Sequence, residues 1–205
     1  MDLPEVRERV EEVSHLALHS PNGLEFLLRY LLARASAQPE HWELCTEVLI
    51  TLSRRCASVL QKPLQKVFTQ MLVSSYQEVY EALMSSLRPG AAADDAFMAI
   101  QWLNVLGNTF FMSQMFLEGL LPFKVLVVAI CDLFGLWRDL HEEVVIMSVY
   151  VMLRMVAGKA DKAKRRNSQI LNGVFANLED VVASTGRDGQ PLISARLSRR
   201  IQKLL

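Results

Sequence analysis

Apolar residues recur along almost the whole chain at spacings of three and four, which is the period of one face of an α-helix. No segment shows the strict apolar/polar alternation that is typical of a half-buried strand. Short stretches rich in proline, glycine and aspartate interrupt the pattern and separate one predicted helix from the next. The pattern predicts nine helices, at about residues 3–19, 21–37, 40–59, 63–87, 94–112, 119–136, 139–157, 162–184 and 192–204.

The predicted helix boundaries coincide with residues that start or stop helices. Pro21, Pro39 and Pro63 stand at predicted starts, where the missing N–H costs nothing, and Pro89-Gly90 follows the fourth helix. Because the connections are short, successive helices should run antiparallel. Nine helices in series cannot share one small core. We therefore expect one all-α domain over residues 1–205, arranged as a solenoid of helix pairs, with a right-angled bundle as the alternative.

Composition supports a folded protein, and the charged residues are unevenly distributed along the chain. Of the 205 residues, 51% are apolar, which is enough to give every helix a buried face. The 22 basic and 22 acidic residues cancel, so net charge argues neither for nor against a nucleic-acid partner. From Arg154 onward, however, basic residues exceed acidic ones by seven, so one end of the molecule is basic.

Cysteine usage and hydropathy indicate the compartment. Cys45, Cys56 and Cys131 are odd in number and lack a CxxC spacing, which fits a reducing environment. The acidic, amphipathic N-terminus is unlike a signal or transit peptide. The longest apolar runs fall short of the roughly 20 residues that a membrane span needs. We expect a soluble protein of the cytoplasm or nucleus.

The chain lacks the sequence signatures of enzymes. It has no phosphate-binding loop, dinucleotide fingerprint, nucleophile elbow or HExxH. His15 and His19 could place two imidazoles on one helix face, but Leu16 stands where a metalloprotease needs glutamate, and no third ligand is suggested. Paired carboxylates stand near predicted helix starts, where the helix dipole favours acids without any catalytic role. We expect no catalytic residues, no metal and no cofactor.

The basic C-terminal region is the best candidate site. If the last two predicted helices pack as a hairpin, their cations could gather into a site for phosphates or for an acidic partner. The alternative is an ordinary solvated cationic face. The candidate residues are Lys164, Arg165, Arg166, Arg196, Arg199, Arg200 and Lys203.

Several short segments carry a family resemblance through their order and spacing. They are Leu16-Ala17-Leu18, the stretch from Arg34 to Pro39, the stretch from Phe68 to Glu81 with Phe68, Leu72, Gln77 and Tyr80, the stretch from Val105 to Phe110 with Gly107 and Phe110, and Ser194 to Leu197. In this order they resemble the middle domain of the translation-initiation scaffold, factor 4G. Asn108 departs from that pattern, because the family has glutamate there.

The resemblance implies a fold and a function. The fold would be a HEAT-repeat-like solenoid of five stacked helix pairs. We expect a monomer, because every helix face finds a partner within one solenoid. The function would be a scaffold that binds and stimulates a DEAD-box helicase, factor 4A, in cap-dependent translation initiation. RNA would bind weakly, and the cap-binding factor would bind through segments outside this chain.

Two other readings stay open, and a third is set aside. The same fold serves scaffolds of mRNA decay, splicing and deadenylation. The C-terminal basic helices could instead make the domain a direct RNA-binding module. Finally, Tyr150 to Val156 loosely fits the peptide pattern that docks on the cap-binding factor, but this stretch lies in a strongly apolar predicted helix, so we expect it to be buried.

Overall fold

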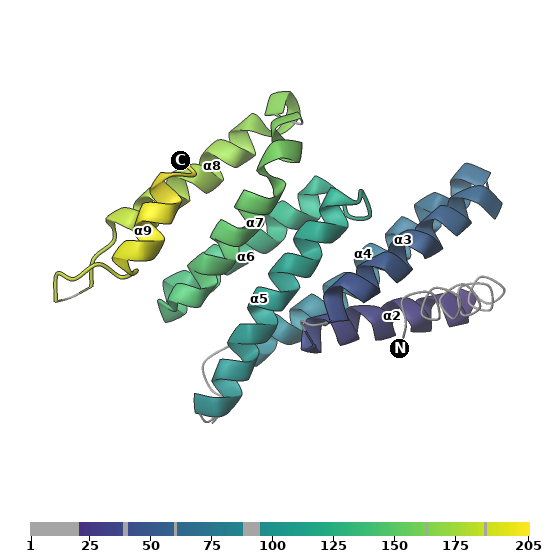
Figure 1. Ribbon diagram of the computed structural model, residues 1–205, viewed down its shortest axis with the longest axis horizontal. Coiled ribbons are helices and arrows are strands. Elements are labelled where there is room, and N and C mark those ends of the chain that lie inside the picture. Colours follow the sequence, from purple (N-terminus) through teal and green to yellow (C-terminus); the bar gives the residue numbers. More distant parts are fainter. Residues whose placement is uncertain (1–20, 39–40, 60, 88–94, 163, 187) are drawn as a thin grey trace. The chain divides into compact units, whose positions relative to one another are not determined.

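The computed structural model of the chain describes residues 21–38, 41–59, 61–87, 95–162, 164–186 and 188–205. Within these ranges the only extended pairing is an isolated bridge between Thr185 and Pro191, and everything regular is helical. The predicted all-α class is therefore confirmed (Figure 1). The described helices are α2 (Pro21–Ala37), α3 (Trp42–Val59), α4 (Gln61–Ser86), α5 (Asp95–Leu117), α6 (Phe123–Leu140), α7 (Glu143–Lys162), α8 (Lys164–Ala183) and α9 (Ala195–Gln202).

Most predicted helices are present with small boundary shifts, and the largest differences have identifiable causes. The helix predicted at residues 3–19 lies outside the described residues. The helix predicted to end near residue 112 continues to Leu117 and stops at Gly119, which adopts a left-handed φ of 78°. The N–H of Leu120 then donates to the carbonyl of Met115 at 2.8 Å, a glycine-dependent helix stop. Gly119, the predicted start of the next helix, therefore ends the previous one.

A residue with left-handed backbone conformation also ends α6, but here it is not glycine. His141 takes a left-handed φ of 57°, and its N–H donates to the carbonyl of Trp137 at 2.7 Å. The His141 ring also lies 5.5 Å from the Trp137 ring, centroid to centroid. Because a left-handed residue cannot continue a helix, α6 ends here and α7 begins at Glu143, four residues later than predicted.

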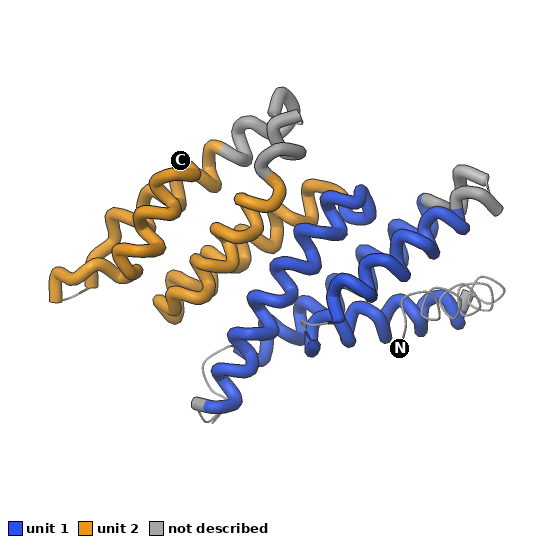
Figure 2. The backbone as a smooth tube through the Cα atoms, in the orientation of Figure 1, with its two compact units in different colours: residues 1–121 blue, residues 122–205 orange. Residues whose placement is uncertain are grey.

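The chain forms two compact units, residues 1–121 and residues 122–205 (Figure 2). The predicted stacking of helix pairs into five repeats stays a prediction. None of the helices among the described residues combines the length and apolarity needed to cross a lipid bilayer.

In the first unit, α2, α3, α4 and α5 pack against one another. Each helix contributes apolar side chains that are almost completely buried. Full burial of one such side chain contributes about 1.5–3 kcal/mol, so these residues supply most of the stability of the unit. The largest of them are Leu28, Leu32, Leu49, Leu52, Phe68, Leu72, Phe111, Met112 and Met115.

A buried polar chain links three helices of the same unit. The Tyr76 hydroxyl on α4 donates to Asn108 Oδ1 on α5 at 2.5 Å, and Asn108 Nδ2 donates to Ser36 Oγ on α2 at 2.8 Å. All three side chains are buried. Burial raises the pKa of Tyr76 well above its ordinary value, so the hydroxyl keeps its proton and remains a donor. We call these residues the polar triad.

The second unit contains α6 to α9, with α6 and α7 packed on each other, α8 against both, and α9 against α8. A hydrogen-bonded loop joins α8 to α9: the N–H of Gly186 donates to the carbonyl of Gln190 at 2.7 Å, and the N–H of Leu192 donates to the carbonyl of Ser184 at 3.2 Å. This loop brings α9 back against α8. The core includes Ile130, Leu133, Phe134, Val145, Ile146, Val149, Leu178, Val181, Leu197 and Ile201.

Replacing Asn108 with alanine should lower the free energy of unfolding by about 2–4 kcal/mol, because the Tyr76 and Ser36 hydroxyls would both stay buried without their partner. Asn104→Ala, a half-buried asparagine on the same helix, is the matched control and should change it by about 0.5 kcal/mol or less. Urea denaturation followed by circular dichroism measures both. Equal effects of the two substitutions would show that the polar triad contributes nothing particular to stability.

Candidate partner-binding surface

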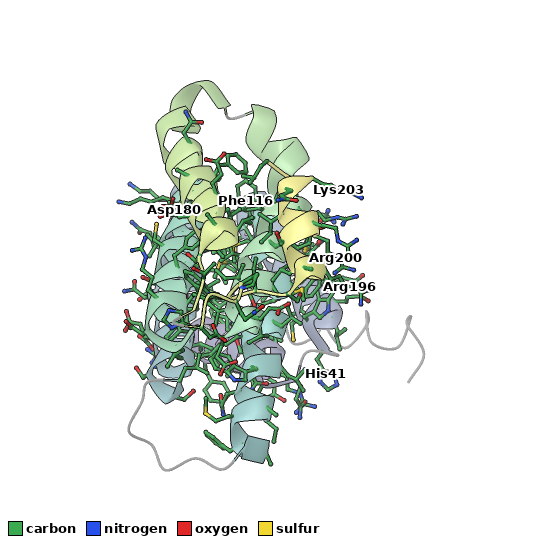
Figure 3. All side chains as sticks on the ribbon, turned by 90° about the vertical axis from the view of Figure 1, so that its left-hand side faces the viewer. His41, Phe116, Asp180, Arg196, Arg200 and Lys203 are labelled. Carbon is green, nitrogen blue, oxygen red and sulfur yellow. The ribbon has the colours of Figure 1, made fainter. Side chains whose placement is uncertain are left out.

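Four cations lie along one face of the short helix α9. Arg196, Arg199, Arg200 and Lys203 are spaced at i, i+3, i+4 and i+7, which places them in one row about 10 Å long. Arg196, Arg200 and Lys203 extend from the same side of the helix (Figure 3). Arg200 is half-buried and the other three are exposed. We call this row the α9 basic stripe.

The opposite face of α9 holds the helix in place. Leu197 and Ile201 are buried, with 1% and 0% of their surface exposed, and Ile193 just before the helix is also buried. Two apolar residues four apart point into the unit on one side, so the cations between them must face outward. The amphipathic pattern of α9 therefore fixes the direction of the basic stripe.

A polar contact fixes the start of α9. Ser194 is the N-cap residue, and its Oγ accepts a hydrogen bond from the N–H of Leu197 at 3.2 Å. The same hydroxyl donates to Glu143 Oε1 at 2.6 Å, and the backbone N–H of Ser194 donates to Glu143 Oε2 at 3.0 Å. Glu143 is the first residue of α7. One carboxylate thus attaches the start of α9 to the start of α7.

The cations of the stripe are not neutralised from within. In the part of the chain that the structure describes, no carboxylate forms an ion pair with any of the four. The Nε–H of Arg199 donates to the backbone carbonyl of Ala195 at 3.1 Å, which holds this side chain along the helix. Asp180 on the neighbouring α8 lies away from the stripe (Figure 3). The stripe therefore presents uncompensated positive charge to solvent.

The C-terminal end of the stripe is concave. Arg199, Arg200, Gln202 and Lys203 line a hollow of about 340 Å³. Three of these four side chains are cationic, and the fourth is an amide that can both donate and accept. Arg196 belongs to the stripe but does not line the hollow.

The other predicted basic residues, Lys164, Arg165 and Arg166, form the first turn of α8, and their side chains lie outside the described part of the chain. The last two helices, α8 and α9, contact each other, which is one condition for the two clusters to join. However, α9 has eight residues and α8 has 20, so α9 lies along only part of α8. That the two clusters join stays a prediction.

The residues that carried the family resemblance are mostly structural. Phe68 and Leu72 are buried in the core of the first unit, and Gly107 is buried on α5 next to the polar triad. Tyr80 stacks on Tyr76 with ring centroids 6.0 Å apart. The remaining ones are Gln77, which is exposed and donates to Glu81 Oε1 at 2.7 Å, Phe110, which is half-buried, and Pro39, which lies outside the described residues.

The described residues contain no metal-binding cluster, and one of their buried thiols is unreactive. Among them, no cluster of three or more His, Cys, Asp or Glu could hold a metal ion. His15 and His19 lie outside this part of the chain. Burial raises the pKa of Cys45 to about 11, so this thiol stays protonated and is a poor nucleophile at neutral pH.

The segment that resembles a cap-binding-factor docking peptide is part of the core. Tyr150, Leu153 and Val156 are 6%, 3% and 1% exposed. Arg154 Nη1 donates to the Tyr150 hydroxyl at 2.8 Å, which occupies the only polar atom of that side chain. The prediction that this stretch is buried is confirmed.

Sequence reasoning missed two groups of surface residues. Phe26 and Tyr30 on α2 are 73% and 52% exposed, and Ile100 and Leu103 on α5 are 55% and 62% exposed. On α2 the signal was present, since Phe26 and Tyr30 lie four apart on the face opposite the buried row that includes Leu28. On α5 no such signal exists, because apolar residues lie on every side of that end of the helix.

No protein-family model matches this chain, and no curated protein matches it in sequence. The function must therefore be argued from the residues and from their placement in the fold.

Replacing Ser194 with alanine should destabilise α9 by about 0.5–2 kcal/mol, because the helix loses its N-cap acceptor and the donor to Glu143. Ser198→Ala, within the same helix, is the control and should be neutral or slightly stabilising, because alanine is the better helix former. Hydrogen exchange of the α9 amides measures the effect. Unchanged protection in Ser194→Ala would mean that burial of Leu197 and Ile201 alone holds the helix.

Proposed function

We propose that this chain is a non-catalytic scaffold domain of the factor 4G type, which binds and stimulates a DEAD-box RNA helicase in cap-dependent translation initiation in the cytoplasm. Support comes from the resemblance, whose segments keep their order over nearly the whole chain, and from the all-helical fold. The observation that carries the proposal is the α9 basic stripe. It is a row of cations without ion-pair partners among the described residues, on a helix anchored by Leu197 and Ile201, and such a surface suits the acidic face of a protein partner.

A scaffold of this kind changes an enzyme without performing chemistry. A helicase with two lobes exchanges between arrangements, and a partner that binds one arrangement more tightly increases its population. The shift is limited by the difference in affinity for the two arrangements, and a hundredfold preference corresponds to about 2.7 kcal/mol. A contact surface that keeps its own shape is required, because a surface that adapts to both arrangements favours neither.

The stripe suits a protein better than single-stranded RNA. Proteins that hold single strands combine cations with exposed aromatic side chains on which bases stack. Neither α9 nor the residues 184–194 that precede it contain Phe, Tyr or Trp. RNA would therefore be held by phosphate attraction alone, with a dissociation constant of about 10⁻⁴ to 10⁻⁶ M at physiological salt. For this reason direct RNA binding is the second candidate.

Reversing all four charges of the stripe, in a variant with Arg196, Arg199, Arg200 and Lys203 replaced by glutamate, should weaken helicase binding at least about tenfold, because like charges would then face each other. Lys124→Glu, which changes an exposed cation on α6, is the control and should bind normally. The measurements are affinity for purified DEAD-box helicases and their RNA-stimulated ATPase rates, with each candidate helicase of translation, decay and splicing tested in turn.

The same proteins test the RNA alternative. Nanomolar binding of a single-stranded RNA by the wild-type domain, lost in the fourfold variant while helicase stimulation survives, would replace the scaffold proposal by the RNA-binding one. In that case the logarithm of affinity should fall with the logarithm of salt by about 0.7 per phosphate contact. Stimulation of a helicase from decay or splicing, and not of one from initiation, would assign the scaffold to that process instead.

A further inference from the structure

The hollow at the C-terminal end of α9 has features that the rest of the basic stripe lacks. Arg199, Arg200, Gln202 and Lys203 line one shallow, open hollow of about 340 Å³. A row of cations on a convex helix contacts a partner at separate points. Three cationic side chains that line one hollow can instead reach the same bound group.

The charge of the hollow matches a phosphate monoester. Such a group carries about −1.5 to −2 charges at pH 7 and has three strong acceptor oxygens. A carboxylate or a backbone phosphodiester carries only one charge and has two free oxygens, so either would leave most of the positive charge in the hollow uncompensated. Arginine is also the side chain that best matches the fork of phosphate oxygens.

Two features of α9 affect how these donors can reach a ligand. The Nε–H of Arg199 is used by the carbonyl of Ala195, so the Nη groups stay available for a ligand. Burial of Ile201 in the same turn fixes the rotation of the helix. The C-terminal end of a helix carries roughly half a negative charge, which opposes an anion, but three whole positive charges outweigh it.

We propose that this hollow binds a phosphorylated serine or threonine side chain of a partner protein. The inference rests on the proposed role of α9 as a partner-binding surface, and it adds that phosphorylation of the partner strengthens the contact. Clusters of arginine are a recurring means of recognising phosphorylated protein segments. The absence of aromatic residues from α9 and from residues 184–194 favours this class of ligand over the bases of an RNA.

Fluorescence anisotropy of the full chain with a labelled glycine-serine heptapeptide carrying one central phosphoserine tests the inference. The phosphopeptide should bind at least about tenfold more tightly than the same peptide with serine or glutamate at that position, because only the phosphate supplies two charges. Arg200→Gln and Lys203→Gln should each weaken binding about fivefold or more by removing one charge-assisted donor. Circular dichroism of each variant checks that α9 is still folded, since neither change touches Leu197 or Ile201.

Two controls separate the hollow from the field of the whole stripe. Arg196→Gln removes a cation that belongs to the stripe but not to the hollow, and Lys124→Gln removes an exposed one on α6. Lys124→Gln should stay within about twofold of wild type, because exposed charges outside the site contribute little. Arg196→Gln should weaken binding less than Arg200→Gln does. An Arg196→Gln effect equal to that of Arg200→Gln would overturn the inference. So would an eight-nucleotide oligouridylate that binds as tightly as the phosphopeptide.

The helicase assay, run on the same proteins, distinguishes the two proposals. Helicase binding without any preference for the phosphopeptide would reject the phosphate-binding hollow and leave the scaffold function intact. Phosphopeptide binding that Arg200→Gln abolishes, in a chain that binds no helicase, would support the hollow and reject the proposed function.

Discussion

The first unit depends on one buried asparagine. Asn108 uses its oxygen to accept from Tyr76 and its nitrogen to donate to Ser36, so one amide satisfies two hydroxyls from two other helices. Each hydrogen bond contributes only about 1 kcal/mol net, which is small beside the apolar core. The larger effect of Asn108 is that it favours one register of α5 against its neighbours. If α5 slipped by one turn, three polar groups would be buried without partners, at a cost of about 1–3 kcal/mol each.

Apolar packing and polar contacts therefore have different roles in this protein. Leucine, methionine and valine fill the cores and tolerate modest shifts, because one apolar contact can replace another. The polar triad in the first unit does not tolerate such shifts, because its groups are buried, whereas water can replace the exposed Ser194–Glu143 contact in the second. The triad fixes which turn of α5 lies beside which turns of α2 and α4. The direction of the α9 basic stripe is set by burial of Leu197 and Ile201, and the Ser194–Glu143 contact adds to it.

The sequence predicted the elements better than it predicted their ends and contacts. Helical periodicity and the prolines located the helices, because these signals are local. The end of α5 was missed, because a glycine such as Gly119 can stand at the start or at the end of a helix. Only its backbone conformation in the fold distinguishes the two. Asn108 stands out in the sequence as a departure from a family pattern. Its hydrogen-bond partners could not be predicted, because they lie 32 and 72 residues away in the chain. Likewise, the basic residues of α9 were identified, while the hollow that three of them share depends on side-chain placement.

Because of the α9 basic stripe, ionic strength should act in opposite directions on the stability of this helix and on its affinity for an anionic partner. Cations three and four residues apart repel each other along the helix, by about 0.2–0.5 kcal/mol for each neighbouring pair. Added salt screens this repulsion and so favours the folded helix, while the same screening weakens attraction to an anionic partner. An anion seated on the stripe would relieve the repulsion directly and stabilise the fold through binding. Without a bound anion, α9 is thus destabilised by its own charges.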